Sequence, residues 1–132
     1  MTNNVMKDLN TARQFYMNDE YEDSLKLYEK CFEESPELFN QSHRTFYAWA
    51  IYQCRIKRYN DDDEFFESAI FITELLAQEN LTKVKACPYT FTVFKVYDCL
   101  VKQNDYYTLT SWLDKINPDL LDETRISYDN IT

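Results

Sequence analysis

The chain has 132 residues and 45% hydrophobic content, enough to build one domain around a core. It contains no glycine, which argues against phosphate-cradling glycine loops and nucleophile elbows, because these need backbone at positive φ or in close approach to a ligand. A formal charge of −9 disfavours a broad nucleic-acid-binding face.

The cysteine and histidine content predicts neither a metal site nor a disulfide framework. Cys31, Cys54, Cys87 and Cys99 form no C-x-x-C pair, and His43 is the only histidine. We expect reduced, mostly buried thiols. No basic and then apolar leader begins the chain, and no uncharged run approaches the roughly 20 residues of a membrane span. These features predict a soluble, cytoplasmic protein.

The first predicted element is a helical hairpin. Apolar side chains fall at helical spacing over residues 5–17, and the run stops at Asn18 and Asp19. A second apolar stripe resumes at Tyr21 and ends shortly before Pro36. Two helices separated by so short a turn pack against each other. Without glycine, Asn and Asp are expected to supply the left-handed backbone of such turns.

Two further hairpins are predicted downstream. An apolar run containing Phe46 and Trp49 ends near Tyr59, and a second helix carries Phe65 and its neighbours. The third hairpin starts at Pro88, which suits the first position of a helix.

The third hairpin turns at Asn104 and Asp105, and its second helix is short. A polar loop is expected around 79–86, one more helical turn around Leu120 and Leu121, and a flexible tail over 123–132.

Acidic clusters at 19–23 and 61–64 stand where the second helices of the first two hairpins begin. Carboxylates there are expected to cap free backbone N–H groups and oppose the helix dipole. A calcium loop would also need a central glycine, which the chain lacks. Since no nucleophile is placed beside His43, neither an enzyme activity nor a cofactor is expected.

Each predicted turn carries a tyrosine, namely Tyr21, Tyr59, and Tyr106 or Tyr107. Together with the helical pattern, these residues resemble the tetratricopeptide repeat, whose pattern is W-x₂-L-G-x₂-Y, A-x₃-F and P. In the first unit the residues that fit the later part of this pattern are Ser24, Tyr28, Cys31 and Pro36. In the second unit Phe46, Trp49 and Ala50 match the early part in character, whereas Asp62 replaces the expected alanine.

The resemblance implies an all-α fold, a short right-handed α-solenoid of about three antiparallel helical hairpins. One domain would cover residues 1–122, with units at about 5–37, 41–78 and 87–117. More loosely, the segments CPYTFTVFKVYDCL and WLDKINPDLL resemble helical-repeat modules at the N-terminus of larger bacterial proteins that are linked to conflict with mobile genetic elements.

In the family that the chain resembles, the first helices of the hairpins line a concave groove that receives a peptide or a partner helix. This implies a non-enzymatic protein-interaction scaffold. The groove positions carried over are Arg13, Tyr16, Arg44, Tyr47, Ile51, Arg55, Phe94, Asp98 and Lys102. Because this set is comparatively basic and aromatic, an acidic peptide is the expected ligand. The competing interpretation of Tyr47, Ile51 and Phe94 is core between repeats.

Two other functions stay open. An uncovered apolar end would favour a homodimer, or an N-terminal assembly module of a larger protein. That end comprises Trp112, Leu113, Ile116, Leu120 and Leu121. A nucleic-acid-associated module is disfavoured by the net charge and would use Arg44, Arg55, Lys57 and Arg58.

Overall fold

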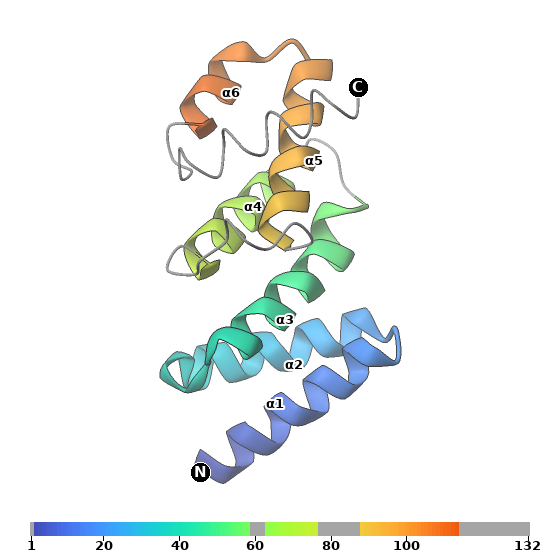
Figure 1. Cartoon of the computed structure of the whole chain (residues 1–132), viewed down its shortest axis with the longest axis vertical. Coiled ribbons are helices and arrows are strands. Elements are labelled where there is room, and N and C mark those ends of the chain that lie inside the picture. The colour runs from blue at the N-terminus through green and yellow to red at the C-terminus, as the bar shows by residue number, and fades with distance from the viewer. Residues whose placement is uncertain (1, 59–62, 77–87, 114–132) are drawn as a thin grey trace.

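The computed structural model describes residues 2–58, 63–76 and 88–113, and every regular element within these ranges is helical (Figure 1). The predicted all-α class is thereby confirmed for the described part of the chain. The elements are α1 (Thr2–Met17), α2 (Tyr21–Glu34), the 3₁₀ turn η1 (Pro36–Leu38), α3 (Gln41–Ile51), the π-helical turn η2 (Tyr52–Ile56), α4 (Asp63–Leu76), α5 (Pro88–Lys102) and α6 (Tyr106–Leu113).

The helices follow one another along the long axis of the molecule, from α1 at one end to α6 at the other (Figure 1). Each helix packs against the next one in the chain. In addition, α1 contacts α3, and α3 contacts α5. The first helices of the three predicted hairpins therefore lie beside one another.

Two hairpin turns use Asp and Asn in the left-handed region, as the absence of glycine predicts. Asp19 has φ 62° and Asn104 has φ 56°. At the first turn, Glu20 N–H donates to Phe15 O at 2.8 Å and Asp19 N–H to Tyr16 O at 3.0 Å. The turn at Asn104 repeats this pairing, which is the Schellman arrangement that closes a helix C-terminus.

The same two turns also share a tyrosine contact. The Tyr21 hydroxyl donates to Asp19 Oδ1 at 2.9 Å, and the Tyr106 hydroxyl contacts Asn104 Oδ1 at 3.4 Å. The turn tyrosine that recurs in the sequence thus recurs in the structure at the first and third hairpins. Tyr59, its counterpart in the second, lies outside the described residues.

Close packing of α1 on α2 depends on a small side chain at position 24. Ser24 and Ala12 are both fully buried, and Ser24 Oγ donates to the Ala12 carbonyl at 2.8 Å. A larger residue at position 24 would separate the two backbones. The same hydrogen bond gives the buried Ser24 hydroxyl an acceptor.

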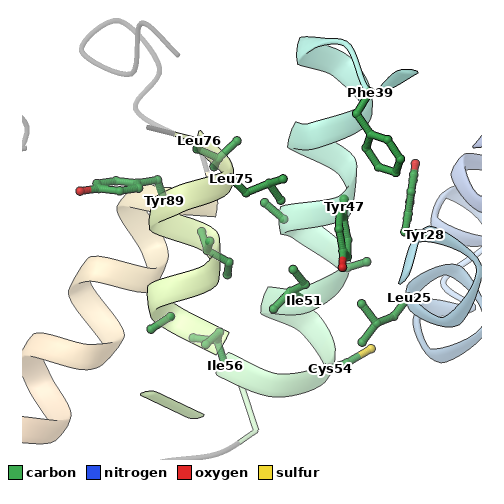
Figure 2. Close-up of a cluster of buried hydrophobic side chains, with 14 of the residues drawn as sticks. Leu25, Tyr28, Phe39, Tyr47, Ile51, Cys54, Ile56, Leu75, Leu76 and Tyr89 are labelled. Carbon is green, nitrogen blue, oxygen red and sulfur yellow. The ribbon is translucent and has the colours of Figure 1, made fainter. Parts of the chain in front are cut away.

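The central core is aromatic between α2 and α3 and mostly aliphatic beyond them, where Phe65 and Tyr89 are also buried (Figure 2). Tyr28 and Tyr47 stack with ring centroids 5.7 Å apart, and Phe39 packs against both rings. Leu75 and Leu76 of α4 and Ile51 of α3 belong to the same buried cluster.

Within the described residues, Cys31, Cys54 and Cys99 are buried and form no disulfide, as expected for reduced thiols. Cys87 lies outside those residues. Burial, followed by the nearby Glu22 carboxylate, raises the pKa of Cys54 to about 11.

Helix starts follow the sequence rules at α3 but not at α2. Asn40 accepts from His43 N–H at 2.9 Å, and His43 Nδ1 accepts from Asn40 N–H at 3.2 Å, which makes a reciprocal capping box. The prediction of carboxylate caps is wrong for α2, because its N-cap Glu20 makes no side-chain cap bond. The neighbouring Asp19 instead closes the turn by accepting from the Tyr21 hydroxyl.

Pro88 opens α5 as its first residue, which confirms the predicted start of the third hairpin. The expected loop at 79–86, the helical turn at Leu120 and Leu121 and the tail at 123–132 lie outside the described residues. Among the helices that are described, none combines the length and the apolar character that crossing a bilayer requires.

Candidate functional site

One surface is built from aromatic side chains of the three first helices. At its α1 end, the Tyr16 ring meets the Phe46 ring of α3 edge to face, with centroids 5.6 Å apart. The guanidinium carbon of Arg13 lies 5.0 Å from the Phe46 centroid, within cation–π range. These two contacts show that the Phe46 side of α3 faces α1.

The same side of the stack continues from α3 to α5. Trp49 of α3, Tyr52 at the start of η2 and Phe91 of α5 form a mutual cluster with centroids 5.6–6.0 Å apart. Phe91 remains 40% exposed, and Tyr16, Phe46, Trp49 and Tyr52 are partly buried. Lys95 lies one helical turn beyond Phe91 and on the same side of α5.

We call this surface the aromatic face, and it comprises Arg13, Tyr16, Phe46, Trp49, Tyr52, Phe91 and Lys95. Its two charged members, Arg13 and Lys95, are both cations and come from its first and last helices. In a chain of net charge −9, the aromatic face thus carries two cations, with the carboxylates of Asp19 and Asp98 at its edges.

A second surface lies between α2, α3 and α4 and is hollowed. This open hollow has a volume of about 570 Å³. We call it the acidic hollow, and its lining residues are Glu29, Tyr47, Ile51, Arg55, Glu64, Glu67, Ser68 and Phe71. Two helix stripes form its walls. The first, from α3 and η2, has residues four positions apart, and the second, from α4, has residues at i, i+3, i+4 and i+7, starting at Glu64.

Arg55 bridges two walls of the acidic hollow. One guanidinium nitrogen lies 3.2 Å from Glu29 Oε1 of α2, and another is paired with Glu64 of α4. Partial burial alone would lower the pKa of Arg55, but the carboxylates of Glu29 and Glu64 outweigh it and raise the pKa. Arg55 is thus a charged side chain already held by two acids.

The predicted groove residues are divided between these two surfaces. Arg13 and Tyr16 belong to the aromatic face, whereas Tyr47, Ile51 and Arg55 line the acidic hollow. The division follows from helical geometry. On α3, Trp49 of the aromatic face and Ile51 of the acidic hollow are two positions apart, so their side chains point about 160° away from each other. Tyr47 is 5% exposed and Ile51 4%, so both also serve the core.

Of the remaining predicted residues, Asp98 and Lys102 adjoin the aromatic face at its α5 end, beside Lys95. Lys102 Nζ pairs with Asp98 Oδ2 at 2.8 Å, and both line a smaller hollow of about 190 Å³ on α5 with Lys95, Cys99 and Gln103. Arg44, in the first turn of α3, and Phe94, in the middle of α5, are partly buried. The nine predicted residues do not share one surface.

The groove predicted from the sequence did not include five members of the aromatic face, namely Phe46, Trp49, Tyr52, Phe91 and Lys95. A usable signal was the aromatic surplus between positions 46 and 52, which holds four large rings within seven residues. One helix face cannot bury four such rings, so some of them must lie on the opposite side.

Within the residues that the structure describes, no three His, Cys, Asp or Glu side chains converge closely enough to hold a metal ion. Compared with known proteins, the chain matches no family model, no curated protein and no solved structure.

Proposed function

We propose that the protein is a non-enzymatic interaction scaffold whose aromatic face binds an acidic, partly apolar peptide segment of a partner protein. One observation carries the proposal: partly exposed rings run across three successive first helices, from Tyr16 and Phe46 to Trp49 and Phe91. Exposed apolar groups gathered in this way mark interaction sites more often than single ones do.

The type of side chain supports a protein ligand. Tyr, Trp and Arg are enriched in binding hot spots, because large rigid rings offer contact area at a low cost in conformational entropy. The contact between Arg13 and Phe46 also limits the freedom of the guanidinium before a ligand arrives.

The charges of the aromatic face support an acidic ligand. Arg13 and Lys95 provide two cations near the ends of the ring series, and a carboxylate-bearing segment complements them. A phosphate ligand on Arg55 is less favoured, because Glu29 and Glu64 already occupy its guanidinium.

The proposal extends to the arrangement of the helices, for which we infer an α-solenoid of the tetratricopeptide type. Three features support it. The first helices of the hairpins are adjacent, the turns at Asp19 and at Asn104 have the same left-handed geometry, and the small Ser24 is buried where α1 meets α2. Buried free thiols suit a reducing compartment such as the cytoplasm.

Charge reversal on the aromatic face tests the proposed function. The probe is a short capped peptide in which glutamate alternates with leucine, measured by calorimetry. Arg13→Glu combined with Lys95→Glu should weaken binding about tenfold or more, since two attractive pairs become repulsive.

The matched control is Lys7→Glu combined with Lys26→Glu, which makes the same change in net charge at exposed positions of α1 and α2 outside the aromatic face. It should retain most of the affinity. Equal losses in the two double variants would show that only net charge matters, and the aromatic face would then not be the site.

A further inference from the structure

The acidic hollow lies across α3 from the aromatic face and has no role in the function proposed above. Its floor is apolar: Tyr47 and Phe71 meet edge to face with centroids 5.6 Å apart, beside Ile51. At about 570 Å³ it falls within the ~300–1,000 Å³ that ligand sites occupy. It can therefore accept a long side chain together with part of its backbone.

The charge on the rim is unbalanced. Three carboxylates, Glu29, Glu64 and Glu67, face one guanidinium, so three negative charges and one positive charge leave a net charge of −2. Arg55 engages Glu29 and Glu64. Glu67 is exposed and makes no ion pair within the described part of the chain, so it offers an open partner for a cation.

The backbone beside the acidic hollow is irregular. Lys57 N–H donates to the Tyr52 carbonyl, five residues earlier, at 2.8 Å, which marks η2 as a π turn. Such turns occur frequently at functional sites. Here the π turn carries Arg55 into the space between α2 and α4.

We propose that the acidic hollow is a second binding site, and that it receives an arginine or lysine side chain from a basic segment of a partner protein. The apolar stem of that side chain would lie on Tyr47, Ile51 and Phe71, and its charged end would reach the rim carboxylates. A bare metal ion fits less well, because the carboxylates do not converge on one point.

The proposed site is independent of the aromatic face. Trp49 and Ile51 point to opposite sides of α3, so a cationic segment in the acidic hollow and an acidic segment on the aromatic face can be bound together. The scaffold would then bridge two partners of opposite charge.

Nuclear magnetic resonance titration of the full chain tests the second site. The probe is a capped pentapeptide with arginine at its centre and leucine on either side, compared with the same peptide carrying citrulline, the neutral isostere of arginine. The arginine peptide should bind with a Kd of about 1 mM or tighter and shift the amide signals of Glu64, Glu67 and Phe71. The citrulline peptide should bind at least about fivefold more weakly.

Glu67→Gln supplies the decisive variant, and Glu74→Gln is the matched control, since it makes the same change on an exposed residue of α4 outside the acidic hollow. Glu67→Gln should weaken arginine binding severalfold, and Glu74→Gln should leave it unchanged. Equal affinity for the arginine and citrulline peptides, shifts confined to other helices, or no binding at about 10 mM peptide would each overturn the proposal. The proposal would also be overturned if self-association of the chain, rather than the peptide, shifted these amide signals.

Discussion

At the scale of single residues, Asn40 and His43 fix where α3 begins. Their reciprocal hydrogen bonds satisfy two backbone N–H groups that a helix N-terminus leaves without partners.

Removing the Asn40 side chain is expected to destabilise the fold. Asn40→Ala should lower the free energy of unfolding by about 1 kcal/mol, because the cap bond to His43 N–H is lost. Asn40→Asp keeps an acceptor and should retain most of the stability. Urea denaturation of both variants measures the difference, and an Asn40→Ala protein as stable as the wild type would show that the cap contributes nothing.

Alkaline pH is expected to destabilise the protein through buried acids that the fold keeps protonated. Burial raises the pKa of Cys54 from its ordinary value of 9.0 to about 11, and burial also raises the pKa of Tyr28 and Tyr47. As pH rises, the unfolded chain releases these protons at a lower pH than the folded chain does. The contribution of the Cys54 thiol to the free energy of unfolding is therefore fully present below pH 9 and is lost between pH 9 and about 11.

Urea denaturation at a series of pH values measures this loss. Cys54→Ala should reduce the slope of stability against pH between 9 and 11, because one of the buried acids is gone. Identical slopes in the variant and the wild type would contradict the assignment.

At the scale of elements, the hairpin turns bear the backbone strain that glycine would otherwise relieve. Asn104 sits at φ 56° after α5, where a side chain with a Cβ is disfavoured and asparagine is tolerated better than alanine. Asp19, which follows α1, adopts the same left-handed conformation.

Substitutions at Asn104 should separate this strain from other effects. Asn104→Ala is expected to cost about 1 kcal/mol of stability, whereas Asn104→Gly should be close to neutral or slightly stabilising. The matched control is Asn10→Ala, an exposed asparagine within α1, which should be neutral or stabilising because alanine is the better helix former. Unfolding free energies that rank alanine above glycine at position 104 would refute this view of the turn.

Helices and turns were largely predictable because their determinants are local. The absence of glycine, the Asn–Asp pairs and the apolar spacing led to Met17, Tyr21 and Pro88 as helix ends or starts. The caps of α2 were not predictable in the same way, because Asp19 had two possible partners, the backbone and the Tyr21 hydroxyl.

At the scale of the whole molecule, the chain presents two surfaces of opposite charge on either side of α3. The aromatic face carries Arg13 and Lys95, and the acidic hollow carries a net charge of −2 from its three glutamates and Arg55. This division was not predictable from spacing alone. Tyr47 and Trp49 are both aromatic and nearly adjacent, and only the packing of Tyr47 on Tyr28 decides which one faces the core.

The most direct test of binding at the aromatic face uses Trp49 as a fluorescence reporter. The chain has two tryptophans, so a Trp112→Phe variant leaves Trp49 as the only one, in contact with Phe91 on the aromatic face. Titration with the capped peptide of alternating glutamate and leucine should change Trp49 fluorescence saturably, and added salt should weaken the effect. Binding that calorimetry detects but Trp49 fluorescence does not report would contradict the account, because the acidic segment would then occupy another surface.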